Sequence, residues 1–364
     1  MKFGLFYEMF VPSDDAGAEA RIVRQTVDQI VHADKFGFDY VWLTEHHFLR
    51  GFSHMSAPEV IFGAAAYQTE HIRFGFGLAL TPPSYNHPVR IAERVAMLDC
   101  LSGGRVDLGS GRSTTPAELY GFGIDPDQSR AQWQEGIDAV ARLLAEENVA
   151  LDGEFVKMPE RTVVPRPVQK PHPPLWVGGV GPGNAERAAK KGLGMLFFAH
   201  KTDYDGLTEA TAAYHANIDK AEPICGAVNK QTAGFVNGLC SYDRDEVRGL
   251  AARKTVEHTM HGNEWVSNGW PGGQPTPSYA HLGGGDIAML REAIKADPAG
   301  VEEFMVNEGF VMAGNPDDCA KALDGFKASG VDQIIIHMQM GGVPHDRIIE
   351  SIELIGKELI PSYR

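Results

Sequence analysis

The sequence predicts one (β/α)8 barrel, the TIM-barrel fold, as a single domain over residues 1–364. Three observations favour it: eight short apolar β-type segments recur, helix-period stretches separate most of them, and one kind of helix-to-strand joint occurs three times. Eight parallel strands with right-handed crossovers close most naturally into a barrel. A doubly wound open sheet is the alternative, although no G-x-G-x-x-G motif follows the first strand to indicate its dinucleotide-binding form.

The predicted strands are short, apolar and mostly non-alternating, which is typical of strands that are buried on both faces. In chain order they are Phe3–Phe6, Asp39–Leu43, Arg73–Ala79, Val106–Gly109, Leu175–Gly178, Gly194–Phe198, Thr232–Leu239 and Gln333–His337. The clearest predicted helices between them carry apolar residues at helical spacing. These helices are Arg21–Lys35, Pro88–Leu101 and Ser129–Glu146.

The repeated joint consists of a helix end with cationic residues, a glycine and then a strand. It occurs at residues 33–37, 188–192 and 326–330, where Gly37, Gly192 and Gly330 each precede an apolar segment. Glycine commonly ends a helix, and cations are favourable in its last turn. The joint is therefore the helix-to-strand half of a βαβ unit.

Two segments depart from the alternation of strands and helices. Asn148–Pro174 is rich in proline and valine and predicts a short hairpin followed by an extended approach to the fifth strand. Thr255–Asn307 is a long, polar, glycine-rich insertion between the seventh and eighth strands. So long an excursion is typical of a lid or substrate loop, and its tryptophan, tyrosine and histidine side chains favour that role over a disordered surface insertion.

Composition excludes several classes of protein. The chain has 364 residues, of which 43% are hydrophobic, and this is ample for a large core. A formal net charge of -15 argues against a nucleic-acid partner. The four cysteines lack CxxC spacing and predict reduced thiols. The absence of a signal-peptide pattern and of an apolar run of about 20 residues predicts a soluble cytoplasmic protein with no membrane partner.

An acid and two imidazoles directly follow the second predicted strand, in Leu43-Thr44-Glu45-His46-His47-Phe48. Barrel enzymes place their chemistry at strand carboxyl ends, and histidine titrates near neutral pH. The alternative is a pair of ordinary core or surface histidines. A metal is disfavoured because no H-E-x-x-H or H-x-H set exists, and neighbouring imidazoles on an extended segment point apart. The sequence therefore predicts acid/base residues and no metal site here.

Two glycine-rich turns predict a phosphate site. Arg112 follows the fourth strand within Gly109-Ser110-Gly111-Arg112, and an arginine can hold phosphate through two parallel hydrogen bonds. Glycines also follow the fifth strand before a helix that is expected to start near Asn184. The free N–H groups of a helix N-terminus bind anions. Each turn alone could be ordinary, but the two turns on adjacent strand ends favour a shared phosphate site.

The chain resembles the bacterial luciferase-like, flavin-dependent monooxygenase family over nearly its whole length. The segments that carry the resemblance are residues 44–48, 81–90, 97–105, 174–183 and 314–319. The most specific is Leu98-Asp99 followed by Leu101-Ser102-Gly103-Gly104-Arg105. The Glu-His-His-Phe run after the second strand points to the FMN-using branch, and the deazaflavin-dependent branch is less similar.

The resemblance implies FMN bound at the carboxyl rim of the barrel, in a homodimer or larger assembly. His46 matches the catalytic histidine of the luminous enzymes, with His47 and Glu45 as supporting neighbours. Arg112 would hold the FMN phosphate. The remaining residues implied for the cofactor are Gly181, Gly183 and Asn184 (phosphate cradle), Gly77 and Leu78 (a cis peptide beneath the isoalloxazine ring), and Val177 and Val180 (along the flavin).

The chain departs from the luminous enzymes at two places. They carry a reactive cysteine where this chain has Gly111, and an acid and a serine near Val180 and Gly181. Because the phosphate contacts there are largely made by backbone, the expectation of FMN stands. The departures argue against light emission and against a long-chain aldehyde substrate.

The function implied is a monooxygenase that takes reduced FMN from a separate NAD(P)H:flavin reductase and uses O2 to oxygenate a small organic substrate, apolar or aromatic. Three alternatives stay open. They are a deazaflavin-dependent hydride-transfer oxidoreductase, a non-catalytic flavin-binding protein and, from the fold alone, a metal-dependent barrel hydrolase.

Overall fold

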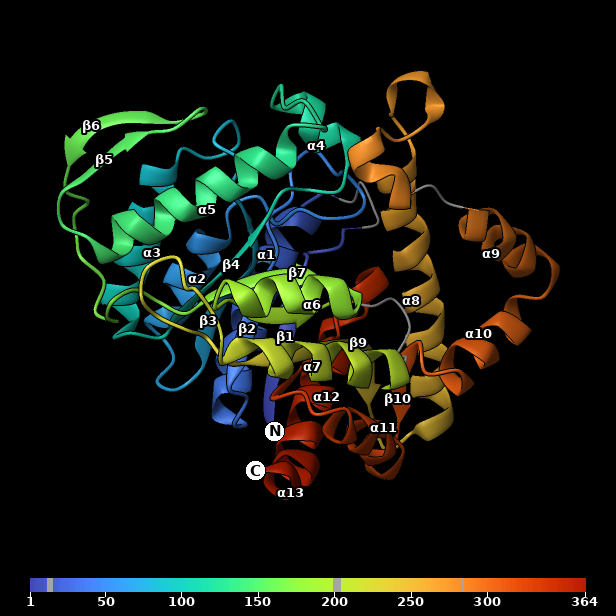
Figure 1. Ribbon diagram of the computed structural model, residues 1–364. Helices are drawn as coiled ribbons and strands as arrows, with labels where there is room; N and C mark the ends of the chain where they lie inside the picture. The colour runs from blue at the N-terminus through green and yellow to red at the C-terminus, as the bar shows by residue number, and fades with distance from the viewer. Residues whose placement is uncertain (12–15, 199–203, 283–284) are drawn as a thin grey trace.

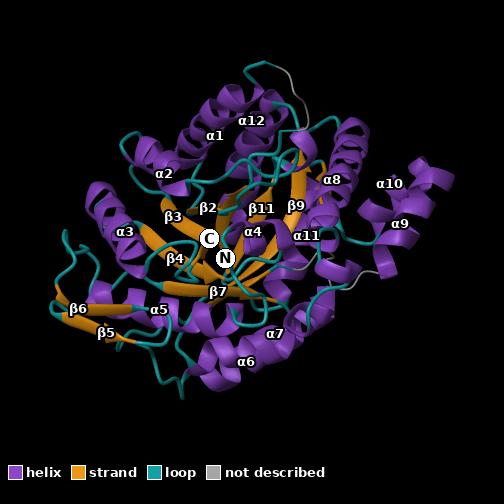
Figure 2. Cartoon of the chain, turned by 90° about the horizontal axis from the view of Figure 1, so that it is seen from above, coloured by secondary structure: helices purple, strands orange, loops and turns teal. Residues whose placement is uncertain are grey.

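The computed structural model describes residues 1–11, 16–198, 204–282 and 285–364, and it confirms the (β/α)8 barrel. Parallel strands pair in the order β1-β2-β3-β4-β7-β8-β9-β11, and β11 pairs again with β1 (Figure 2). The strands are β1 Lys2–Tyr7, β2 Tyr40–Leu43, β3 Arg73–Leu80, β4 Val106–Gly111, β7 Leu175–Gly179, β8 Gly194–Phe197, β9 Thr232–Cys240 and β11 Gln333–His337. Each predicted strand matches one of these.

One strand of the sheet was not predicted. β10, Val311–Gly314, extends the sheet beyond the closed barrel. It pairs with Asn237–Cys240 at the end of β9, whereas β11 pairs with the start of β9. A four-residue apolar segment has too little pattern of its own to be recognised, and its pairing depends on the length of β9.

Helices surround the barrel (Figure 2). The predicted helices correspond to α1 Ala18–Lys35, α3 Pro88–Ser102 and α5 Ser129–Ala145. The others around the strands are α2 Pro58–Ala66, α4 Pro116–Gly121, α6 Gly181–Lys190, α7 Tyr204–Ile218, α8 Arg244–Ser267, α11 Pro316–Ala328, α12 His345–Leu354 and α13 Ile360–Tyr363.

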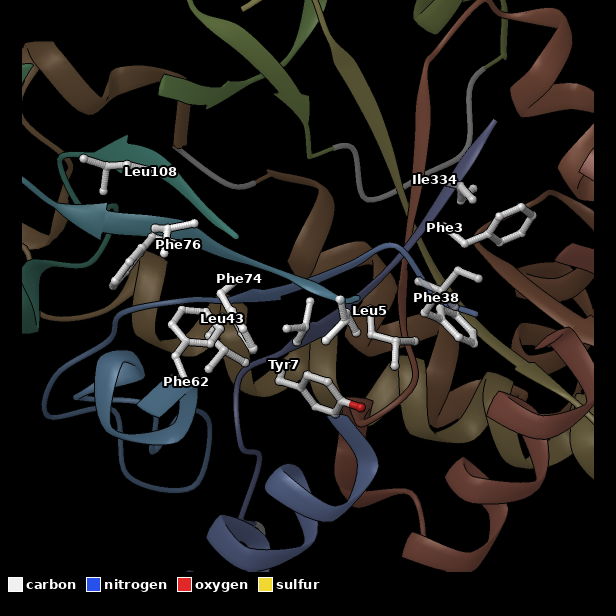
Figure 3. Packing of buried hydrophobic residues seen from close by; sticks show 14 of the residues in the cluster. Phe3, Leu5, Tyr7, Phe38, Leu43, Phe62, Phe74, Phe76, Leu108 and Ile334 are labelled. Atoms are coloured by element: carbon white, nitrogen blue, oxygen red, sulfur yellow. The ribbon is translucent and has the colours of Figure 1, made fainter. Parts of the chain in front are cut away.

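Apolar side chains lie on both faces of the strands. On β1, Phe3, Leu5 and Tyr7 join the large cluster between strands and helices, which Figure 3 shows from close by. Phe6, on the opposite face, joins a smaller cluster inside the barrel that contains Trp42. Because successive side chains of a strand point to opposite faces, a barrel strand must be apolar at consecutive positions.

Two large rings pack against each other inside the barrel. Trp42 and Trp176 lie edge to face with their ring centroids 5.2 Å apart. Gly75 and Gly194 lie beneath them, and a Cβ at either position would collide with the neighbouring indole. The glycines of β3 and β8 therefore make room for tryptophan, and the barrel is a packed core rather than a pore.

The proline-rich segment forms the predicted hairpin. β5, Val149–Asp152, and β6, Lys157–Arg161, pair antiparallel and lie outside the barrel (Figure 2). This separate two-stranded sheet leads into the extended approach to β7.

The insertion at 255–307 is mostly helical, so the expectation of a glycine-rich loop was wrong. α8 continues to Ser267 and is followed by short 3-10 turns at Pro271–Gly273 and Pro277–Leu282, and then by α9 Gly285–Ala296 and α10 Pro298–Asn307 (Figure 1). Glycines at 269, 272 and 273 have positive φ and lie in turns. The helices could form because the glycines fall largely at their ends. Gly283 and Gly284 lie outside the described residues.

The chain termini meet at the end of the barrel where the strands begin (Figure 1). The amino group of Met1 donates a hydrogen bond of 2.7 Å to the carbonyl of Tyr363. Among the described residues, every helix is too short or too polar to cross a bilayer.

Candidate functional site

The carboxyl ends of the strands bring together residues that are far apart in the chain. His46 and His47 lie beyond β2, Glu8 follows β1, and His337 is the last residue of β11. β1 pairs with both β2 and β11, so these side chains share one rim.

His46 is held by Glu118, which sequence reasoning missed. The imidazole Nδ1 lies 3.1 Å from Oε1 of this carboxylate, which also accepts the backbone N–H of His47 at 2.9 Å. The hydroxyls of Ser113 and Thr115 each donate to Oε2 at 2.6 Å. Glu118 has 0% of its surface exposed, so its orientation depends on these four donors. Only the sequence pattern Thr115-Pro116-x-Glu118, a helix start, could have pointed to it.

The charges of His46 and Glu118 support each other. Burial opposes ionisation of both groups. For His46 the carboxylates of Glu118, Glu8 and Glu45 outweigh burial and raise its pKa. For Glu118 the imidazole and the two hydroxyls outweigh burial and lower its pKa. Both pKa shifts favour the charged forms, an imidazolium beside a carboxylate.

Glu45 and His47 form a second, separate arrangement. The Glu45 carboxylate accepts hydrogen bonds from the Leu80 N–H at 2.8 Å and from Asn86 Nδ2 at 2.7 Å, and it lies 3.2 Å from His47 Nε2. His47 also stacks on Tyr85. The neighbouring imidazoles thus contact different groups, as predicted, and Glu45 ties the end of β2 to the end of β3.

A third group contains Glu8, His258 and His337. His258 Nε2, from α8, lies 2.8 Å from Glu8 Oε2, and His46 Nε2 lies 3.9 Å from Glu8 Oε1. His337 Nδ1 lies 3.1 Å from Asn237 Oδ1. Glu8 and His337 were missed, although an acid directly after a strand and a histidine at the end of one are signals of the kind that identified His46.

Aromatic rings surround these imidazoles. His337 contacts Phe6 and Phe235 edge-on or tilted, with centroid distances of 5.4 and 6.1 Å. His258 contacts Phe52 at 4.9 Å and Phe10 at 5.6 Å. The polar groups of the rim therefore lie in an apolar environment, where electrostatic interactions are strengthened.

Arg112 lies beside the glycine-rich turn, as predicted. β4 and β7 pair with Ser110 opposite Val177, so both strands end at the same level. The Arg112 guanidinium donates to the hydroxyls of Ser129 and Ser278, both at 2.9 Å, and to the Ser278 carbonyl at 3.1 Å. It also lies 4.2 Å above the ring of Tyr279. The Nε hydrogen of Arg112 and one of its two Nη2 hydrogens have no acceptor among the described residues.

The turn after β7 leads directly into α6, which begins at Gly181 rather than near Asn184. No side chain caps this helix, and within the described part of the chain no acceptor is recorded for the first-turn N–H groups of Gly183 and Asn184. A Cβ built on Gly181 would meet nothing within 4 Å, and one on Gly183 only Arg187, at 3.7 Å. The donors thus border open space, which fits a phosphate group.

The peptide bond between Gly77 and Leu78 is cis, as the resemblance implies. The Leu78 side chain lies against Gly109, Gly111 and Gly178, close to where each would carry a Cβ. The side chain of Val177 packs instead into the cluster between strands and helices. The contact of Val177 with the cofactor stays a prediction, which this packing of its side chain does not favour. Val180 is 54% exposed.

The family model for luciferase-like monooxygenases matches residues 1–333. The chain belongs to this family. Its sequence is 32% identical over 289 residues to a limonene 1,2-monooxygenase of Rhodococcus erythropolis, covering 77% of this chain and 70% of that protein. It is 24% identical over 366 residues to the oxygenase component of a flavin-dependent trigonelline monooxygenase of Acinetobacter baylyi, covering 100% and 96%.

Two further comparisons concern the fold and the reductase branch of the family. The monooxygenase RslO1 of Streptomyces bottropensis superposes with a TM-score of 0.80 at 26% identity and full coverage of both chains. A 5,10-methylenetetrahydromethanopterin reductase of Archaeoglobus fulgidus is 27% identical over 91% of this chain and 93% of its own length. With flavin-dependent monooxygenases among its relatives, this member of the luciferase-like family is an oxidoreductase.

Proposed function

We propose that this protein is an FMN-dependent monooxygenase that receives reduced FMN from a separate flavin reductase and inserts one oxygen atom of O2 into a small apolar or aromatic molecule. One observation carries the proposal. The pair of half-buried His46 and buried Glu118 and the candidate phosphate cradle occupy the same barrel rim, in a chain whose relatives include named flavin-dependent monooxygenases.

The cofactor assignment starts from the phosphate. Arg112 would bind it with Nε and the remaining Nη2 hydrogen, and the first-turn N–H groups of Gly183 and Asn184 would complete the cradle. The ring system would then extend along Val180 and the Gly77–Leu78 peptide. Reduced FMN, when bound, would supply the electrons that activate O2.

His46 would deliver the proton that the reaction needs. Its raised pKa suits a general acid, and Glu118 keeps the ring in one orientation. The phenylalanine rings around the rim would exclude water and bind an apolar or aromatic substrate. The segment 268–282 would act as the cover of this site.

Two partners follow from the same assignment. One relative is named an oxygenase component, which supports an NAD(P)H:flavin reductase as a separate partner. For a homodimer the support is four exposed apolar residues on the packed helices α2 and α3 or directly after α2, namely Val60, Tyr67, Met97 and Leu101.

The test combines the protein with a flavin reductase, NAD(P)H, FMN and isotopically labelled O2, and follows a panel of apolar and aromatic compounds by mass spectrometry. We expect labelled product from the wild type, and a loss of at least about 100-fold in His46→Ala with FMN affinity retained. His71→Ala, which changes an exposed histidine, is the matched control. Equal turnover in His46→Ala would remove this residue from the mechanism.

The second candidate is hydride transfer with a deazaflavin, which the Archaeoglobus fulgidus reductase supports. The two candidates differ in their need for oxygen. Substrate reduction under anaerobic conditions, with binding of the deazaflavin and no labelled product, would favour the reductase.

A further inference from the structure

We propose that Glu8, His258 and His337 form a binding site for a divalent first-row transition metal ion. One donor atom from each of the three side chains lies within 4.8 Å of the other two. Two imidazoles and one carboxylate are the ligand set of many zinc and non-haem iron sites that keep open coordination positions. The inference is independent of the proposed function and needs no flavin.

The three ligands come from different parts of the fold. Glu8 follows β1, His337 ends β11, and His258 is on α8. The rings of His258 and His337 have centroids 4.9 Å apart and planes inclined by 73°. Ligand atoms on one tetrahedral ion lie about 3.4 Å apart, so side-chain movements of about an ångström would bring these atoms, which lie within 4.8 Å of one another, to that spacing.

Unsatisfied buried atoms face this group. His337 is only 1% exposed, and its Nε2 has no hydrogen-bond partner among the described residues. His258 approaches Glu8 through Nε2, 2.8 Å from Oε2, and its own Nδ1 also has no hydrogen-bond partner among the described residues. Buried polar atoms without partners are costly, and each is a potential metal ligand.

His337 is already arranged as a metal ligand. Its Nδ1 donates to Asn237 Oδ1 at 3.1 Å, which leaves the lone pair on Nε2. Metal-binding histidines almost always donate their second N–H to such an acceptor, which fixes both the tautomer and the ring orientation. Asn237 therefore serves as the outer-sphere partner of the site.

The charges of the side chains at the rim also favour a bound cation. Apart from Glu118, which pairs with His46, the nearly buried carboxylates of Glu8 and Glu45 have only imidazoles and neutral donors as partners within the described chain, without lysine or arginine. Buried carboxylates need compensating positive charge, which a divalent cation supplies. Imidazole ligands favour zinc, iron, cobalt or nickel over calcium and magnesium.

The experiment uses the full-length protein after chelator treatment and dialysis. Calorimetric titration with Zn2+, and visible absorption during titration with Co2+, are expected to report one ion per chain. Glu8→Gln and His337→Ala should each weaken binding more than 10-fold, and Asn237→Ala should weaken it about 10- to 100-fold. His71→Ala, on an exposed histidine, should bind like the wild type.

Circular dichroism of each variant checks that it is folded. Wild-type binding that is no tighter than that of the folded Glu8→Gln and His337→Ala variants would overturn the site, and so would stoichiometric binding that neither variant changes. Neither result bears on FMN binding or oxygenation, which are measured without added metal. Failure of the metal site and failure of the proposed function are therefore distinguishable.

Discussion

The imidazole of His46 and the carboxylate of Glu118 form an ion pair of 3.1 Å at the rim of the barrel. The two residues are 72 positions apart in the chain. Glu118 also accepts the backbone N–H of His47, so one side chain from α4 fixes both the imidazole and the backbone next to it. A substitution of Glu118 should therefore affect both stability and the reaction.

Glu118→Gln should destabilise the fold by about 3–5 kcal/mol, because it removes the counter-charge of a half-buried imidazole and the charged acceptor of two hydroxyls. Chemical denaturation at neutral pH measures the change in the free energy of unfolding. Glu186→Gln changes an exposed carboxylate that pairs with Lys190, and should stay within about 0.5 kcal/mol of the wild type. A loss no larger than that of this control would show that the ion pair contributes little.

The contribution of Glu118 should depend on pH. Burial alone would raise the pKa of this carboxyl, but His46 and the hydroxyl donors stabilise the carboxylate and hold the pKa below its usual range. A group with a lowered folded-state pKa contributes stability above its unfolded pKa and loses it as pH falls through the folded value. The stability gap between wild type and Glu118→Gln should therefore narrow from neutral pH to below about pH 4. A constant gap would contradict the ionised state of Glu118.

Arg112→Ala should weaken FMN binding by about 10- to 100-fold, because a charge-assisted hydrogen bond contributes about 1.5–3 kcal/mol. Quenching of flavin fluorescence measures the affinity. Arg112 also holds Ser278, so Ser278→Ala serves as the control and should weaken FMN binding much less than Arg112→Ala does. Equal weakening by both substitutions would mean that attachment of the insertion, and not phosphate binding, matters for the cofactor.

Trp270→Ala should detach the segment 268–282 from the barrel. Trp270 is buried against Tyr279, with centroids 5.3 Å apart, and its indole N–H donates to the Val266 carbonyl at 2.7 Å. Removing a buried tryptophan costs about 3–5 kcal/mol. Limited proteolysis should cut within 268–282 while circular dichroism stays near that of the wild type. The control Phe304→Ala removes an exposed ring from α10. If Trp270→Ala resisted proteolysis as well as Phe304→Ala does, Trp270 would not anchor this segment.

The double variant Tyr67→Glu, Met97→Glu should be monomeric if the exposed apolar group on α2 and α3 is the dimer interface. Tyr67 is 87% exposed and Met97 59% exposed, and two buried charges would oppose association. Light scattering coupled to gel filtration gives the mass. Met289→Glu, a change of a 66% exposed side chain on α9, is the control and should leave the assembly intact. An unchanged mass in the double variant would place the interface elsewhere.

Periodicity was sufficient to predict the barrel and much of its rim. The barrel strands are apolar on both faces, and a pattern in neighbouring residues is enough to recognise them. His46 was identified because strand ends carry chemistry, and Arg112 because a glycine-rich turn precedes it. Glu118 and His258 could not be identified in this way, because they reach the rim from helices whose packing depends on the whole fold.

The helices of the insertion at 255–307 could not be predicted from the sequence either. Its glycines indicated a loop because composition does not reveal where a helix ends. Asp243 starts α8 by accepting the N–H of Glu246, well before the segment in which glycines become frequent. Sequence periodicity was weak there because α8 has no single apolar face along its length.

Arg112 connects the barrel rim with the segment that follows α8. It extends from the end of β4, and through Ser278 and the Tyr279 ring it also holds the chain segment that follows α8. An anion that engages the remaining N–H groups would immobilise this guanidinium, and with it the segment that it holds. By thermodynamic reciprocity, any interaction that orders this segment also raises the affinity for the anion. Binding of the cofactor and closure of the rim would therefore be energetically linked.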